Sequence, residues 1–212
     1  MTSRRSLQRG RESGGATEET RRMPGGDAVE RILRTAAALF AFRGYAGTSV
    51  EEIVETAKTT KPTLYHHFKD KRTLYVTLLD ETMSAFCSAL EPPSVEPSSA
   101  RIRLRRLFLR VDGFRRGQPN GMHLVNAHLY GPPSGTPRYR LSDYRGRIEE
   151  SISNVLLPAV AEGKVREEDF GSLLLIVLSL LQDMQHAAGN SIFTCGPSME
   201  QYFKALDLLL EG

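Results

Sequence analysis

The segment from Thr48 to Lys71, TSVEEIVETAKTTKPTLYHHFKDK, constrains the fold of this chain more than any other stretch. Ser49 followed by Glu52 is a capping-box pattern, in which each side chain can satisfy a free amide at a helix start. Thr60 is a second N-cap candidate, and the proline after it is tolerated in a first helical turn. Two short helices joined by a tight turn have the dimensions of a helix-turn-helix. The inward-facing apolar positions are Val50, Ile53, Val54, Ala57, Leu64 and Phe68.

The same residues carry a resemblance to a known family. Gly44-Tyr45 precedes the segment, Thr48-Ser49-Val50 opens it, and the second helix ends in Leu64-Tyr65-His66-His67-Phe68. In this spacing the segment resembles the DNA-binding region of the TetR family of bacterial transcriptional regulators. The family usually has Ala-Gly in the turn, where this chain has Ala57-Lys58. If that position needs a positive φ, lysine costs about 1 kcal/mol there.

The resemblance implies double-stranded operator DNA as a partner. Hydroxyls and amides at the two helix starts are available for phosphates, and the N-terminal end of the second helix usually meets base edges in the major groove. The corresponding family positions place Tyr65 and Lys71 on the phosphate backbone. His66 and His67 point about 100° apart on a helix, so we expect one of them to face DNA. The predicted DNA contacts are Thr48, Ser49, Thr60, Lys61, Thr63, Tyr65, His66 and Lys71.

We expect three regions along the chain. Residues 1–26 have six arginines against three acids and little to bury, which predicts a disordered basic tail. Such an arm could lie along DNA or be a solubilising extension. Residues 27–72 would form the DNA-binding domain, its first helix capped by Asp27 and ended by Gly44 in a left-handed conformation. Residues 73–212 would form a helical ligand-binding and dimerisation domain. The predicted fold class is therefore all-α.

Apolar periodicity predicts the helices of the second domain. A helix capped by Asp70 runs to about Leu90, and its wide apolar arc suits a link between the two domains. Its successors are expected at 101–116, 120–130, from Pro137 through a kink at Pro158 to 162, at 167–188 and at 198–210. The helix at 167–188 is apolar on nearly all sides, and the last has a clean apolar stripe. Both are more easily buried by a second copy, which favours a homodimer sealed by a four-helix bundle.

Polar groups scattered near apolar ones in the second domain suggest a pocket for an unidentified small-molecule effector. Its predicted residues are Phe86, Phe108, Phe114, His123, Asn126, Tyr130, Gln182 and His186. The arginine-rich face of the helix at 101–116 favours solvent exposure, with an anionic ligand or acidic partner as the alternative.

Composition narrows the function classes. The net charge of +3 is too small to indicate nucleic acid without local clustering. Cys87 and Cys195 are expected as free thiols, and the lack of a long apolar run or leader predicts a cytoplasmic protein without membrane contact. We find no HExxH, nucleophile elbow or phosphate-binding glycine loop, so we expect neither an enzyme nor a cofactor or metal. The predicted function is a ligand-responsive repressor released from a palindromic operator. The first alternative is a helical protein-interaction module without sequence-specific DNA binding, and the second is an enzyme.

Overall fold

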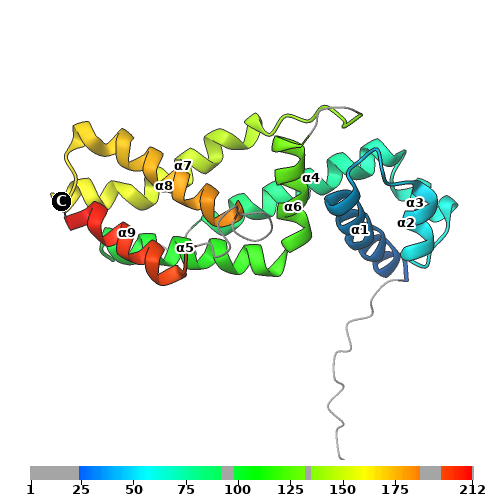
Figure 1. Cartoon of the computed structure of the whole chain (residues 1–212), viewed down its shortest axis with the longest axis horizontal. Coiled ribbons are helices and arrows are strands. Elements are labelled where there is room, and N and C mark those ends of the chain that lie inside the picture. The colour runs from blue at the N-terminus through cyan, green and yellow to red at the C-terminus, as the bar shows by residue number, and fades with distance from the viewer. Residues whose placement is uncertain (1–23, 92–97, 132–134, 187–196, 212) are drawn as a thin grey trace, which may run out of the picture.

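The computed structural model describes residues 24–91, 98–131, 135–186 and 197–211. Within these ranges the secondary structure is helical throughout, which confirms the predicted fold class (Figure 1). Most of the expected basic tail and Cys195 lie outside these ranges. The elements are α1 (Pro24–Arg43), α2 (Val50–Thr56), α3 (Lys61–His67), α4 (Lys71–Leu90), α5 (Ala100–Gly117), α6 (Pro119–Tyr130), α7 (Ser142–Ala161), a short 3-10 helix (Glu167–Asp169), α8 (Phe170–His186) and α9 (Met199–Glu211).

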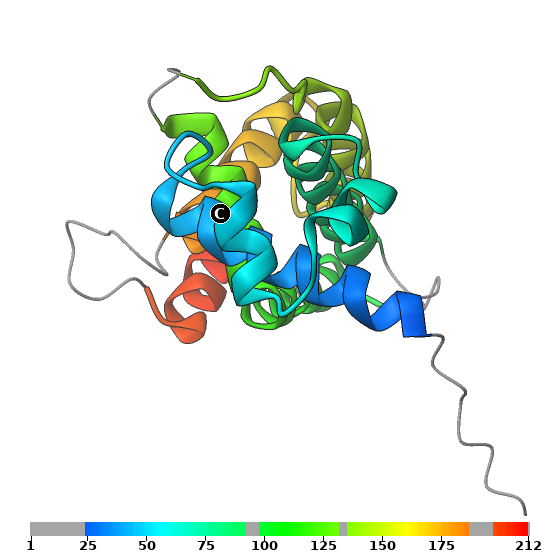
Figure 2. The ribbon, with the colours of Figure 1, turned by 90° about the vertical axis from the view of Figure 1, so that its right-hand side faces the viewer.

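Helices α1 to α3 form a small unit around shared apolar side chains. Ile32, Phe40, Ile53 and Leu64 have no exposed surface, and Phe68 closes the unit beneath α3. Ser49 accepts a hydrogen bond from the Glu52 amide at 3.1 Å, and Thr60 accepts one from the Thr63 amide at 3.3 Å. Both predicted N-caps are therefore confirmed. In Figure 2 these blue-to-cyan helices face the viewer, with the remaining helices behind them.

The turn between α2 and α3 places a lysine in the left-handed backbone conformation, where the family usually has glycine. Lys58 has a φ of 51°, the only positive φ among the described non-glycine residues. Its amide bonds to the Glu55 carbonyl at 3.2 Å, and the Thr59 amide bonds to the Val54 carbonyl at 2.9 Å. These two bonds form a Schellman motif, which normally has glycine in the left-handed position.

Replacing Lys58 by glycine should raise the free energy of unfolding by about 1 kcal/mol, because glycine relieves the steric cost of the left-handed conformation. Urea unfolding at a fixed protein concentration measures the change. Glu55→Gly is the matched control: it lies inside α2, where glycine should cost about 1 kcal/mol. A loss of stability in Lys58→Gly would show that the strain is absent or compensated.

Helix α4 joins the N-terminal unit to the rest of the molecule, as predicted. Asp70 caps it by accepting from the Thr73 amide at 2.6 Å. Its buried side chains lie on several sides of the helix, and it contacts α1, α5, α6 and α7. At its other end Arg110 of α5 donates to the carbonyls of Ala89 and Leu90 at 3.0 and 3.1 Å. The last turn of α4 is thus held by a cation, which also suits the helix dipole.

Three predicted helix boundaries need correction. Helix α1 begins at Pro24, so Asp27 lies within the helix and is not its N-cap. Helix α7 begins at Ser142, five residues after Pro137, because the intervening segment packs on α4 through the Tyr139 hydroxyl. The segment expected as one helix from 167 starts as a 3-10 turn before α8.

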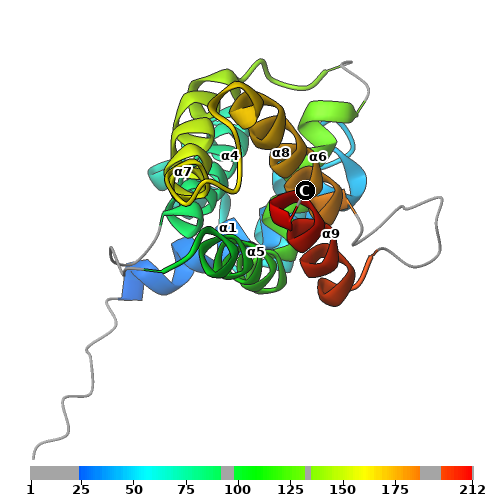
Figure 3. The same ribbon diagram turned by 90° about the vertical axis from the view of Figure 1, so that its left-hand side faces the viewer.

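Helices α5 to α9 complete the second half of the molecule. Viewed from its left-hand end in Figure 3, α7 and α9 lie on opposite sides, with α8 between them. The arginines of α5 mostly contact their own chain: Arg101 and Arg105 pair with Asp207 of α9, and Arg115 and Arg116 pair with Asp112. The expected basic face therefore holds some ion pairs within the chain, while Arg106 and Arg116 remain exposed. Leu175, Ile176 and Leu208 of α8 and α9 remain exposed in this single chain.

Candidate nucleic-acid interface and effector pocket

Helix α3 presents its polar side chains on the outer surface of the N-terminal unit. Lys61, Tyr65 and His66 are exposed, whereas Leu64 between them is fully buried. Thr63 is half-buried, and its hydroxyl lies 2.9 Å from that of Thr60. This arrangement follows from the helical period, because residues three or four apart share a face and the residues between them point elsewhere. The exposed face of α3 is therefore available to a groove of DNA.

Two further residues complete this surface. Ser49 is exposed at the start of α2, and His67 is exposed beside His66, with ring centroids 4.9 Å apart. Both histidines face solvent, so the geometry does not single out His66. Lys61 forms an ion pair with Glu51 of α2, and this hydrogen bond lowers the pKa of the Glu51 carboxyl. A phosphate or base that binds Lys61 must replace this exposed pair.

The structure excludes Thr48 as a DNA contact. Its side chain is 1% exposed, and its hydroxyl donates to the Gly44 carbonyl at 2.9 Å. Gly44 ends α1 with a φ of 73°, as predicted, and the Thr48 hydroxyl closes the loop that follows. The residue is polar because it satisfies a buried carbonyl, a role that the sequence pattern does not distinguish from phosphate binding.

Lys71 has an internal role besides the predicted one. Its Nζ donates to the carbonyls of Tyr45 and Thr48, both at 2.9 Å, and lies 4.2 Å from the centre of the Tyr45 ring. The first turn of α4 is thereby attached to the loop between α1 and α2. An ammonium has three donors, so one remains for a phosphate. Loss of Lys71 would disturb this loop, so it is not a clean test of a DNA contact.

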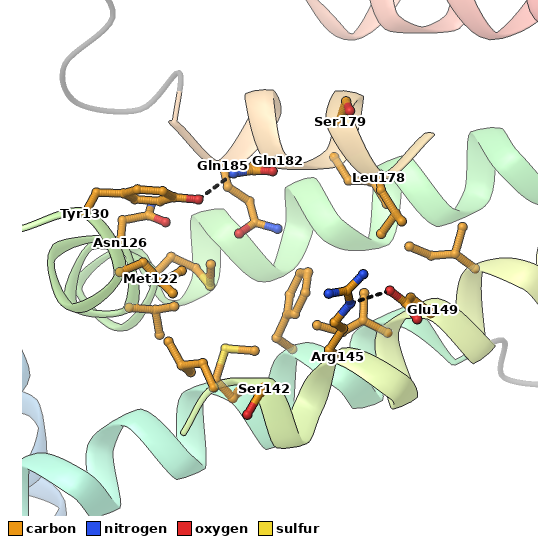
Figure 4. Close-up of a pocket in the computed structure, with 18 of the residues that line it drawn as sticks. Met122, Asn126, Tyr130, Ser142, Arg145, Glu149, Leu178, Ser179, Gln182 and Gln185 are labelled. Carbon is orange, nitrogen blue, oxygen red and sulfur yellow. Dashed lines mark hydrogen bonds and ion pairs between the residues drawn. The ribbon is translucent and has the colours of Figure 1, made fainter. Parts of the chain in front are cut away.

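A cavity of about 590 Å³ lies among α4, α6, α7 and α8 (Figure 4). Its size is ordinary for a small-molecule site. The walls are mainly apolar, with Met83 and Phe86 from α4, Met122 from α6 and Leu178 from α8. Polar side chains lie at its edges, and Figure 4 places Tyr130 and Gln182 at one end and Arg145 and Glu149 at the other.

The predicted pocket residues fall into three groups. Four of them line this cavity: Phe86, Asn126, Tyr130 and Gln182. As ligand contacts they stay predictions, although Tyr130 and Gln182 already bond to each other. The side chain of His186 lies outside what the structure describes.

Three predicted pocket residues lie elsewhere. Phe108 is fully buried against Tyr202 of α9, with ring centroids 5.8 Å apart. Phe114 packs behind Phe86 at 5.7 Å and does not line the cavity. His123 stacks on Phe42 of α1 at 5.4 Å. An aromatic ring near polar residues in the sequence does not reveal which neighbour it packs against, and all three pack against other rings.

Several cavity residues were missed by the sequence analysis. Arg145 and Glu149 lie one turn apart on α7, and Arg145 Nε donates to the Glu149 carboxylate at 2.6 Å. Their spacing of four residues is that of an ordinary ion pair on a helix surface, so no sequence signal indicated that they border a cavity. Gln185 follows Gln182 by three residues and so shares its face of α8. This shared face was the one sequence signal that could have placed Gln185 in the cavity wall.

Polar and aromatic contacts connect the cavity region to the N-terminal unit. The Tyr139 hydroxyl donates to Asp80 at 2.7 Å, and Tyr144 of α7 bonds to the same carboxylate. His128 of α6 lies 3.2 Å from the Tyr75 hydroxyl, and Tyr75 packs edge-on against Tyr45 at 5.1 Å. Hydrogen bonds from the two tyrosines lower the pKa of Asp80. The start of α7, the end of α6 and the α1–α2 loop therefore contact one another through α4.

Stability should fall at high pH because of Tyr75. Burial raises the pKa of this phenol to about 12, and the nearby Tyr45 adds to the effect. A raised pKa favours the neutral phenol in the folded state, so its contribution is complete below pH 10 and is lost as pH rises towards 12. The expected slope is up to about 1.4 kcal/mol per pH unit. Urea unfolding between pH 9 and 11 should show a shallower fall in Tyr75→Phe; parallel curves would contradict this assignment.

Comparison with known proteins decides the family. Residues 32–78, which span most of α1 through the first half of α4, match the family described as bacterial regulatory proteins, tetR family. The chain is 33% identical over 158 residues to the uncharacterized HTH-type transcriptional regulator YxaF of Bacillus subtilis, covering 74% of this chain and 82% of YxaF. The chain belongs to the TetR family.

Two further TetR-family comparisons extend over most of the molecule. The HTH-type transcriptional regulator TcmR of Streptomyces glaucescens is 28% identical over 176 residues, 76% of each protein. The crystal structure of the TetR family transcriptional regulator PfmR from Thermus thermophilus superposes with a TM-score of 0.64 at 27% identity, covering 87% of this chain and 96% of PfmR. Like these relatives, this TetR-family protein is a DNA-binding transcriptional regulator. This favours the predicted function over the alternative of a helical protein-interaction module. None of its described helices is long and apolar enough to cross a membrane.

Proposed function

We propose that this protein is a dimeric repressor whose affinity for its operator falls when a small molecule occupies the cavity among α4, α6, α7 and α8. The observation that carries this proposal is the position of α4. Met83 and Phe86 of α4 line the cavity, and Lys71 at its start holds the α1–α2 loop of the DNA-binding unit. One helix therefore contacts both the effector site and the DNA-binding unit.

On DNA, α3 would enter the major groove. Lys61 and Thr63 at its N-terminal end would meet base edges, and Tyr65 and His66 would lie along the groove. Ser49 and Thr60 cap the two helix starts and would place their amides near phosphates. Lys71 would offer its remaining donor to the backbone. The extents of the DNA-binding domain (27–72) and of the effector and dimerisation domain (73–212) belong to the same proposal.

A second copy of the chain would cover α8 and α9. Leu175, Ile176 and Leu208 are 65%, 40% and 73% exposed, and a second copy would remove this apolar surface from water. Packing α8 and α9 against their symmetry mates gives a four-helix bundle and sets the distance between the two copies of α3. The operator would then be an inverted repeat.

The effector would act by shifting a population between two arrangements of the dimer. A ligand changes operator affinity only by its differential affinity for those arrangements. Asp80 of α4 bonds to Tyr139 and Tyr144 at the N-terminal end of α7. A ligand that moves α7 would therefore also move α4. A tilt of α4 would change the separation of the recognition helices.

Selection of bound duplexes from a random DNA pool tests this function. Purified full-length protein at near-physiological salt should enrich an inverted repeat with half-sites about one helical turn apart. Thr63→Ala should relax sequence preference at one position per half-site, at a cost of about 1–3 kcal/mol. Thr77, a half-buried threonine farther along α4, replaced by alanine, serves as a threonine control outside α3. Binding that is only salt-sensitive and without sequence enrichment would refute the operator-binding role.

A further inference from the structure

The described residues that line the cavity carry no net formal charge. Among its lining residues only Arg145 and Glu149 are ionised, and they pair with each other at 2.6 Å. Their side chains are 79% and 39% exposed, so the pair lies at the rim. The remaining polar lining groups are hydroxyls and carboxamides. An ion buried deeper in the cavity would lose hydration without meeting a partner of opposite charge, which is strongly unfavourable.

The end of the cavity away from Arg145 gathers neutral groups that both donate and accept hydrogen bonds. Asn126 and Tyr130 project from α6, and Gln182 and Gln185 project from α8 (Figure 4). Gln182 donates to the Tyr130 hydroxyl. Within the described part of the chain, the carboxamides of Asn126 and Gln185 have no hydrogen-bond partner. Two half-buried amides without partners at the edge of a cavity are suited to a ligand that supplies the missing bonds.

The rest of the wall limits how polar that ligand can be. The apolar wall is formed by Met83, Phe86, Met122 and Leu178. The many polar groups of a sugar or nucleotide would find no hydrogen-bond partners against it. Methionine side chains adapt to the shape of an apolar ligand, so these walls accept a rigid ring system or a folded chain.

We propose that the effector is an uncharged, mainly apolar molecule with a carbonyl, amide or hydroxyl group that bonds to Asn126 and Gln185. This inference rests on the proposed function, because it assumes that the cavity is the effector site. The closest competing class is an organic anion, for which Arg145 would exchange Glu149 for the ligand carboxylate.

Three fluorescent probes with one skeleton test the ligand class: pyrene-1-carboxamide, pyrene-1-carboxylate and pyrene-1-methylammonium. Titration of the purified full-length protein should show the carboxamide binding at least tenfold more tightly than either charged probe. Asn126→Leu and Gln185→Leu should each weaken carboxamide binding about tenfold and leave the charged probes unchanged. The matched control is Asn154→Leu, an exposed amide on α7 that does not line the cavity.

Other outcomes overturn the proposal. Tightest binding of the carboxylate, lost in Arg145→Ala, would assign the site to anions, and tightest binding of the ammonium would assign it to cations. Absence of binding by all three probes, or carboxamide binding unaffected by both leucine variants, would also refute the ligand class. Operator binding is measured separately without probe, so its failure identifies a failure of the proposed function. If the carboxamide binds as expected and operator occupancy does not change, the ligand class stands and the effector role fails.

Discussion

Phe108→Ala is expected to lower the free energy of unfolding by about 3–5 kcal/mol, the usual cost of truncating a large buried aromatic side chain. Phe108 has no exposed surface and packs against Tyr202, so it joins α5 to α9. Truncation would leave a cavity at this junction and loosen the helix that carries Leu208. Because domains are stable by only about 5–15 kcal/mol, the variant should be near the limit of folding. Urea unfolding at a fixed concentration measures the loss, since the proposed dimerisation would make stability concentration-dependent.

Leu109→Ala is the matched control for this variant. Leu109 is the next residue of α5 and is 53% exposed, so its truncation should change stability by about 0.5 kcal/mol or less. Because Phe108 is a core residue, any loss of ligand affinity in Phe108→Ala would follow from unfolding. Wild-type stability together with selective loss of effector binding would instead return Phe108 to the pocket.

Leu208→Glu is expected to convert the proposed dimer into monomers. Leu208 is 73% exposed on α9, and in the proposed dimer it would be covered by the second copy. Burying an unpaired carboxylate there would cost several kcal/mol, whereas in the monomer the glutamate faces water and costs little. Operator affinity should fall by about 10²–10⁴, because the two half-sites are no longer bound by linked recognition helices. Analytical ultracentrifugation and operator titration measure the two effects.

Leu157→Glu is the control for the dimer variant. Leu157 is 53% exposed on α7, which Figure 3 shows on the opposite side of the molecule from α9. The Leu157→Glu variant should keep the oligomeric state and the operator affinity of the wild-type protein. A Leu208→Glu protein that also remains dimeric would place the interface elsewhere.

The DNA-binding unit could be predicted closely because its signals are local. Ser49, Thr60 and Asp70 each accept an amide hydrogen bond within their own first turn, as their sequence positions indicate. The glycine that the family usually has at the position of Lys58 raised the question of a positive φ there, and Lys58 has one. Thr48 was misassigned because a threonine hydroxyl bonds equally well to a phosphate or to a carbonyl of its own chain.

The cavity could be predicted only in part, because its walls come from helices far apart in the sequence. Asn126 and Gln182 were identified as polar residues among apolar neighbours, and they line the cavity. Phe108 was predicted as one of their apolar neighbours in the pocket, but it lies in the core. Periodicity tells which side of a helix is buried, but it does not tell which buried side chain packs against another ring and which borders an empty volume.

The cations at the two ends of α4 have a mechanical consequence. Lys71 binds carbonyls of the preceding loop, and Arg110 binds the last carbonyls of the helix itself. A helix secured at both ends behaves as a rigid lever, because neither terminus can fray to absorb a displacement. Its 20 residues span about 30 Å, so a tilt of about 5° at one end displaces the other by roughly 2–3 Å. In the proposed dimer, whose symmetry would double them, displacements of this size would take two recognition helices out of register with consecutive major grooves.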